Sequence, residues 1–225
     1  MMPTPRPSTL WSDFYGSTWS STVLDHSTTS PILTQARSAR LAAGGVRFLH
    51  APVFMSPQMC REGQGLIVVS GSCEIFEVVG PALSRMTGDV LYLGERRELA
   101  AAYKLFGNAM LFAMSAGLAD VLAIARNLSV SGEDAVGLFA RLNTGLVIPL
   151  RGPKMAAGDF SGTFELAMAR KDVRLMIEAA GDQPLIVLPS LAARMDDAIR
   201  AGHGKDDLAA IAAAVVRLRD PSATT

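Results

Sequence analysis

The sequence predicts an α/β region followed by an all-α region, with the change of texture near residue 96. Short apolar runs alternate with helical stretches before that point, which is typical of a parallel sheet covered by helices. After Gly94 the chain is dense in Ala, Leu and Met at helical spacing, and no run of comparable strand character follows. We therefore expect two regions of different architecture in one chain.

The composition is that of a globular protein. Of the 225 residues, 49% are hydrophobic and 19% are charged, which is ample for a packed core. Lys plus Arg and Asp plus Glu both number 21, so the net charge is zero and no nucleic-acid partner is expected. The two cysteines and the three isolated histidines have no metal-ligand spacing, so neither a metal site nor a disulfide framework is expected.

The longest uncharged apolar stretch, 105–119, is shorter than the about 20 residues that a bilayer crossing needs. We expect it to be a buried helix. The N-terminus has no continuous apolar segment of the kind found in secretory signals. A cytoplasmic location and no membrane partner are the resulting expectations.

The first region follows an irregular leader, residues 1–21, which is rich in Ser, Thr and Pro. Ser30 is a suitable N-cap, and Pro31 suits the first position of a helix. Ser72 is expected to cap a second helix, kinked or broken near Pro81 because proline lacks a backbone N–H. The expected elements are strand 22–25, helix 31–43, strand 46–53, strand 66–70, helix 74–86 and strand 90–93.

The second region, residues 97–220, is expected to be all helical and to end in a short tail, 221–225. Ser131 is expected to cap a helix with acidic residues in its first turn. The Gly- and Pro-rich stretch 144–162 is expected to be a loop. The expected helices cover 98–127, 133–142, 164–180, 185–201 and 206–217.

One lysine has mostly apolar neighbours. Lys104 and Asn108 lie four residues apart, and therefore on the same face of the helix over 98–127. Loss of hydration lowers the pKa of a lysine toward the range that is useful for proton transfer. From spacing alone, the more common case is a lysine that extends its ammonium group to solvent, beside an amide bonded to backbone. In the same way, Asp172 either pairs with a basic group across the helical region or belongs to a solvated helix face.

Five short stretches, in chain order, resemble the motifs of one family, the β-hydroxyacid dehydrogenases typified by 3-hydroxyisobutyrate dehydrogenase and tartronate semialdehyde reductase. The resemblance extends from about Val23 to about Val216. The stretches are DHSTTSP (25–31), GGVRFLHAPV (44–53), YKLFGN (103–108), ARKD (169–172) and GHGKDD (202–207), which resemble D-x-S-T-x-x-P, G-x-x-F-x-D-A-P-V, K-x-x-x-N, the helical K-D pair and G-x-x-K-x-D.

The resemblance implies an oxidoreductase that uses NAD or NADP and acts on a small 3-hydroxy acid or its carbonyl partner. Lys104 matches the family's general acid/base, and Asn108 matches a substrate-binding amide. Asp172 would support this cluster from another helix. Thr28 and Lys205 match positions that contact the cofactor in relatives. A homodimer formed through the helical region is also implied.

The sequence departs from the family pattern at several positions. His50 stands where the family has Asp, and bulky Phe54 and Met55 stand where relatives have small residues, which leaves Ser56 as a hydroxyl donor to the substrate. Gly107, by contrast, distinguishes this chain from the related 6-phosphogluconate dehydrogenases, which have a histidine at this position, so the resemblance argues against that branch.

Family members begin with a strand, the G-x-G-x-x-G fingerprint and a helix that binds the pyrophosphate. Residues 1–22 contain no such fingerprint. The resemblance therefore implies that residues 22–96 are a remnant of a dinucleotide-binding α/β domain, followed by the all-α domain. The alternative is a non-catalytic remnant that dimerises through its helices and binds cofactor weakly or not at all.

Overall fold

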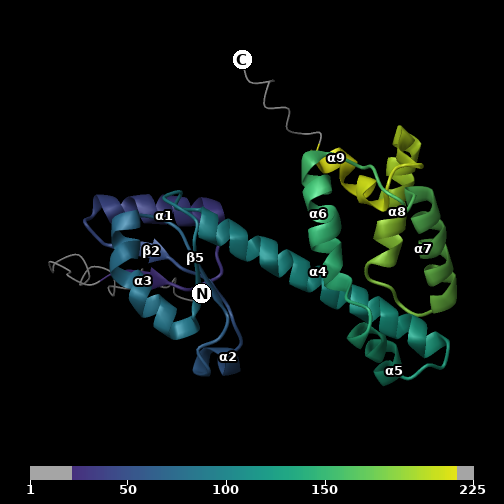
Figure 1. The fold of residues 1–225 in the computed structure, drawn as a ribbon, viewed down its shortest axis with the longest axis horizontal. Coiled ribbons are helices and arrows are strands. Elements are labelled where there is room, and N and C mark those ends of the chain that lie inside the picture. The colour runs from purple at the N-terminus through teal and green to yellow at the C-terminus, as the bar shows by residue number, and fades with distance from the viewer. Residues whose placement is uncertain (1–21, 217–225) are drawn as a thin grey trace, which may run out of the picture. The chain divides into compact units, whose positions relative to one another are not determined.

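The computed structural model describes residues 22–216, which form two compact units whose boundary follows Met110 (Figure 1). The predicted leader and tail lie outside the described residues. The sequence places the change of architecture near residue 96, but the first unit also holds the first turns of the next helix. Ala101 is fully buried there, and the Ala100 N–H donates to Ser70 Oγ at 2.9 Å.

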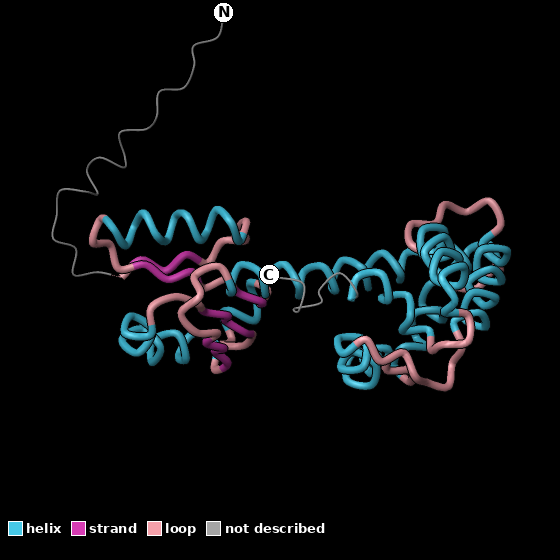
Figure 2. Tube along the Cα trace, turned by 90° about the horizontal axis from the view of Figure 1, so that it is seen from above, coloured by secondary structure: helices cyan, strands magenta, loops and turns pink. Residues whose placement is uncertain are grey.

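All strands of the described residues belong to the first unit, and the second unit consists of helices and loops (Figure 2). The elements of the first unit are β1 (Val23–Asp25), α1 (Pro31–Ala43), β2 (Phe48–His50), β3 (Val53–Phe54), α2 (Pro57–Arg61), β4 (Leu66–Val69), α3 (Cys73–Thr87), β5 (Asp89–Tyr92) and the start of α4 (Leu99–Asn127).

The predicted helix caps of the first unit are confirmed. Ser30 Oγ accepts a hydrogen bond from Leu33 N, and Ser72 Oγ accepts one from Ile75 N. The sequence predicts a kink or a break near Pro81, and the helix is not broken, because α3 continues through this residue as one helix. Contacts of α3 with β4 and β5 hold it in place, so tertiary packing outweighs the cost of one missing hydrogen bond.

The strands form two small sheets. In the first sheet, β1 pairs with β2 in parallel. In the second sheet, β4 pairs with β5 in parallel, whereas β3 pairs with β4 antiparallel. The predicted strand over 46–53 is split into β2 and β3, because Pro52 has no N–H to donate to a ladder. Two bonds, Val68 N to Pro52 O at 3.0 Å and Ser70 N to His50 O at 3.3 Å, extend the β3–β4 pairing to β2.

The core of the first unit lies between the strands β2 and β4 and the helix α3. The largest of its buried side chains are Leu49, Ile67 and Leu83, each fully removed from solvent. Phe76 on α3 stacks on Tyr92 of β5 with ring centroids 4.3 Å apart. The loops that follow the strands are therefore attached to a well-packed core.

The second unit contains the rest of α4 and further helices. Its elements are α5 (Gly132–Gly137), 3₁₀ turns at Leu138–Ala140 and Thr144–Leu146, α6 (Val147–Ala157), α7 (Leu166–Ala180), α8 (Leu188–Ala198), a π-helical turn at Ile199–His203, a 3₁₀ turn at Leu208–Ala212 and α9 (Ala213–Val216).

Two predictions for the second unit have different outcomes. Ser131 caps α5 as predicted, since its Oγ accepts from Asp134 N at 3.0 Å. The predicted loop over 144–162 is wrong, because α6 occupies Val147–Ala157 despite Pro153 in its interior. Contacts with α9 and with the turn at Leu208–Ala212 stabilise α6, and local propensity does not include such contacts.

A buried carboxylate joins two helices of the second unit. Asp120 on α4 is 2% exposed and accepts three backbone N–H bonds, from Ile186 (2.6 Å), Val187 (2.9 Å) and Leu188 (2.8 Å). These amides lie at the start of α8, where N–H groups have no partner within the helix. Burial alone raises the pKa of Asp120, but the three hydrogen bonds outweigh it and hold the pKa below its usual value.

The apolar stretch 105–119 is helical as predicted, but its predicted burial is wrong. Phe106, Leu111 and Phe112 on α4 are each more than half exposed. Helical spacing shows that these side chains are apolar, but it does not show which surface covers them. By length and composition alone, α4 is the one helix of residues 22–216 that could cross a membrane, with a mean hydropathy of 1.6 in its most apolar part.

Candidate functional site

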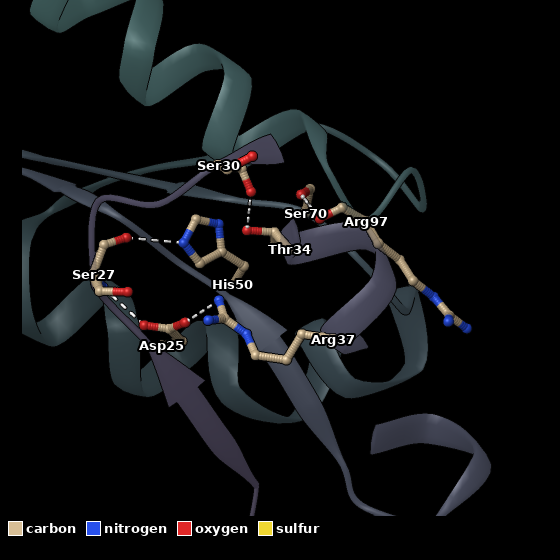
Figure 3. A network of polar contacts seen from close by, with 8 residues as sticks. All are labelled: Asp25, Ser27, Ser30, Thr34, Arg37, His50, Ser70 and Arg97. Atoms are coloured by element: carbon tan, nitrogen blue, oxygen red, sulfur yellow. Dashed lines mark hydrogen bonds and ion pairs between the residues drawn. The ribbon is translucent and has the colours of Figure 1, made fainter. Parts of the chain in front are cut away.

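The polar groups of the first unit gather where β1 and β2 end. In α/β sheets, ligands bind outside the carboxyl ends of the strands, because the loops there are free to carry functional groups. Asp25 and His50 are the last residues of the neighbouring strands β1 and β2 and are paired in register. Figure 3 shows both side chains in one network with Ser27 and Arg37.

Asp25 anchors the loop after β1. One of its oxygens accepts from Ser27 N at 2.9 Å, and the other pairs with the Arg37 guanidinium of α1 at 2.5 Å. Burial raises the pKa of Asp25, but the Ser27 bonds and the Arg37 charge outweigh burial and place the pKa below its usual value. The carboxylate is therefore ionised at neutral pH and fixes the start of the loop.

His50 is 1% exposed and replaces the aspartate of the family motif. Its Nε2 lies 2.9 Å from Ser27 O, as Figure 3 shows, and its Nδ1 is buried without a partner. Burial lowers the pKa of His50 below its ordinary value, against smaller opposing effects of Ser27 and Asp25. His50 is therefore neutral near pH 7.

Lys104 lies half-buried on α4 and reaches the segment after β2. Its Nζ donates to Val53 O at 2.8 Å and lies 4.1 Å from the centroid of the Phe54 ring. Burial lowers the pKa of Lys104, which is the direction that a proton-transferring amine needs. The amine is bonded to this backbone carbonyl, and the side chain remains partly exposed.

Phe54 and Gly107 fit together next to this lysine. A Cβ on Gly107 would collide with the ring of Phe54, so only glycine leaves room for the ring on this face of α4. Gly107 directly precedes Asn108. The bulky Phe54, which departs from the family pattern, and Gly107 are therefore parts of one packing arrangement.

The other predicted residues of the first unit lie on nearby elements. Asn108 is half-buried one helical turn after Lys104 on α4. Ser56 follows β3 and caps α2, with its Oγ accepting from Met59 N at 3.2 Å, so its O–H remains able to donate. Thr28 is exposed in the loop between β1 and α1.

The remaining predicted residues belong to the second unit. Asp172 on α7 is part-exposed and pairs with its neighbour Lys171 at 3.3 Å. Lys205 is exposed after the π-helical turn, and the adjacent Gly204 O accepts from Ala167 N of α7 at 3.0 Å. Within residues 22–216, no three metal-ligating side chains lie close enough to hold a metal ion.

Sequence reasoning missed Arg37 and the role of Phe54. Arg37 lies on the α1 face toward Asp25, a pairing that follows only once α1 packs beside β1. The bulky residue at position 54 was visible in the sequence. Its packing against Gly107 was not, because the two residues lie on different elements, β3 and α4, and are 53 residues apart in the chain.

A family profile described as the NAD binding domain of 6-phosphogluconate dehydrogenase matches residues 16–94. Among curated proteins, 2-(hydroxymethyl)glutarate dehydrogenase of Eubacterium barkeri is 26% identical over 84% of this chain and 64% of its own length. Glyoxylate/succinic semialdehyde reductase 1 of Arabidopsis thaliana is 27% identical over 85% of this chain and 67% of its own. The chain thus spans about two thirds of the length of these relatives.

Among solved structures, the imine reductase from Myxococcus stipitatus in complex with NADP⁺ superposes with a TM-score of 0.77 at 18% identity. The match covers 84% of this chain and 68% of the reductase. At this identity the likeness concerns the fold.

Proposed function

Because the chain belongs to the β-hydroxyacid dehydrogenase family, we propose that it is an NAD(P)-dependent oxidoreductase for a small 3-hydroxy acid of the 3-hydroxyisobutyrate type, or for its carbonyl partner. The observation that carries this proposal is the position of Lys104. Its amine is bonded to Val53 O in the segment after β2, and burial lowers its pKa.

Lys104 would act as the general acid/base. Its unprotonated amine can donate one hydrogen to Val53 O and still offer a lone pair to the hydroxyl of the substrate. In oxidation Lys104 takes the hydroxyl proton, and in reduction it returns a proton to the carbonyl oxygen. When bound, the nicotinamide cofactor supplies or accepts the hydride.

The other residues would bind and orient. Asn108, one turn from Lys104, offers an amide to the substrate, and Ser56 offers its hydroxyl hydrogen. By the resemblance, Asp172 on α7 of the second unit would be a further substrate-binding residue. Thr28 in the first unit and Lys205 in the second are both exposed, and the resemblance gives each as a contact of NAD or NADP. The match of residues 16–94 to an NAD-binding domain supports this cofactor class.

The partner for the exposed α4 surface would be a second copy of this chain. Large apolar side chains along α4 are uncovered in the single chain, and a homodimer would remove them from water. Cys60 and Cys73 are free thiols, which suits a cytoplasmic enzyme. Light scattering at micromolar concentration should give twice the mass of the chain, and a monomer that stays soluble would contradict the dimer.

Titration with NADH and NADPH, followed by nicotinamide fluorescence, tests the proposal directly. Saturable micromolar binding, with turnover of one member of a panel of small 3-hydroxy acids, is the expected result. Absence of any response at millimolar cofactor would favour the non-catalytic dimer.

A further inference from the structure

Two histidines cross between the loops that follow β1 and β2. His26 Nδ1, after β1, lies 2.5 Å from the carbonyl oxygen of Ala51, and His50 Nε2, at the end of β2, lies 2.9 Å from the carbonyl oxygen of Ser27. Each histidine therefore bonds to backbone of the other histidine's segment. The backbone bond from Ala51 N to Asp25 O, 2.8 Å long, lies between the two.

The acceptors determine the tautomer of both rings. A carbonyl oxygen only accepts, so His26 carries its proton on Nδ1 and His50 carries its proton on Nε2. In the neutral His50 ring, Nδ1 is then a bare acceptor, and it is the atom that has no partner. The buried His50 Nδ1 without a partner costs stability, and the hydrogen bond from His50 Nε2 to Ser27 O offsets part of that cost.

The crossed bonds fix two segments that carry different groups of the candidate site. The first continues from Ser27 to Thr28. The second continues from Ala51 to Val53, whose carbonyl oxygen receives Lys104 Nζ. Ala51 is fully buried, whereas Ser27 and Thr28 are exposed, so the histidines tie an exposed loop to a buried one.

We propose that His26 and His50 are positioning residues, which fix the spacing between the loop that carries Thr28 and the segment that holds Lys104. This inference rests on the proposed function for the roles of Thr28 and Lys104. Neither histidine touches the reacting atoms. Their effect is to couple cofactor binding to the placement of the proton-transferring amine.

The test compares two kinds of variant at each histidine. His26→Leu and His50→Leu remove the donor at similar volume. His26→Asn and His50→Gln retain it, because the amide nitrogen of Asn reaches the position of Nδ1 and that of Gln reaches the position of Nε2. We call the two crossed bonds, His26 to Ala51 O and His50 to Ser27 O, the histidine clamp. Hydrogen exchange of the Ser27 and Ala51 amides measures how firmly the clamp holds the two segments in the absence of ligand. NADPH titration and kinetics measure its effect on cofactor affinity and turnover.

In the Leu variants, we expect these amides to exchange roughly five- to tenfold faster, as for the loss of one hydrogen bond. The Kd for NADPH should rise and kcat should fall together, and Asn and Gln should restore both. Exchange at the wild-type rate in the Leu variants would refute the proposal that the histidine clamp fixes these two segments. Faster exchange with unchanged NADPH affinity and kcat would overturn the coupling, since a merely structural role lowers stability alone. If the wild-type chain binds neither NADPH nor NADH, the proposed function fails, and the exchange measurement still decides on the clamp.

Discussion

The two units of this chain bury polar groups in different ways. In the first unit, Arg37, Arg47 and His50 each keep a buried side-chain nitrogen without a partner, whereas His203 is the one such case among the described residues of the second unit. The buried acids of the helical unit are well satisfied. Asp120 accepts three backbone amides, and Asp207 accepts Arg151 Nε at 2.9 Å and Ala209 N at 3.0 Å.

We interpret this difference as one of role: buried polar groups with several hydrogen-bond partners stabilise the fold, whereas those without a partner belong mainly to the region proposed to bind ligands. Buried carboxylates that accept several hydrogen bonds from the protein contribute stability. Partnerless atoms cost stability, and in native proteins they concentrate at sites where structure serves function. The first unit is therefore the region in which substitutions should affect activity more than stability.

The largest expected effect is on turnover. Lys104→Ala should lower kcat roughly 10²- to 10⁴-fold, because it removes the proposed general acid/base, while the Kd for NADPH stays nearly unchanged. Steady-state kinetics and fluorescence titration measure the two quantities. Lys154→Ala, at an exposed position of α6, is the matched control. An equal loss of cofactor affinity would mean that Lys104 is structural.

The converse is expected in the second unit. Asp120→Leu leaves three amides of residues 186–188 without their acceptor and should lower the free energy of unfolding by about 3 kcal/mol or more. Urea denaturation measures this loss. Asp182→Asn, at an exposed position between α7 and α8, should change stability by less than about 0.5 kcal/mol. Comparable losses in both variants would show that the Asp120 contacts contribute little.

A smaller change is expected next to Lys104. Gly107→Ala should destabilise the first unit by about 1–3 kcal/mol, since the new methyl group meets the Phe54 ring. In the background Phe54→Ala, the same substitution should cost almost nothing. A double-mutant cycle in urea measures the coupling between the two positions. Additive effects would refute the contact.

The smallest expected effect distinguishes the units by acid sensitivity. The pKa of His50 is lowered by burial, so its neutral form stabilises the first unit fully above the ordinary histidine pKa, and this stability is lost as pH falls below about 6.5. The lowered pKa of Asp120 makes its contribution complete above the ordinary carboxyl pKa of about 3.9 and lost at lower pH. Protection from exchange, measured by region from pH 7 to 5 relative to the rate of an unprotected amide at each pH, should therefore fall in the first unit before the second. His50→Gln should remove that early loss of protection, and its persistence in this variant would assign it to another group.

Local signals in the sequence predicted much of the fold. Serine caps at positions 30, 72 and 131 act over three residues, and all three are confirmed. The absence of a break at Pro81 and the error over 144–162 have one cause, since contacts distant in the chain hold helices through prolines that local rules treat as breaks. The pairing of β3 with β4 and the capping of α8 by Asp120 likewise depend on segments brought together only by folding.

The features of the candidate site likewise divide into those that local spacing predicts and those that depend on folding. Helical spacing placed Lys104 and Asn108 on one face of α4. The seat of Phe54, the pairing of Arg37 and the bonds of the histidines require the relative positions of α1, α4 and the sheet. No spacing rule contains that information.

The fit of the Phe54 ring on Gly107 also constrains how this lineage can change. A side chain larger than hydrogen at position 107 is tolerated only after position 54 has become small, so the order of substitutions is fixed. Among related sequences, bulk at one position should accompany a small residue at the other, and chains that are bulky at both should be selected against.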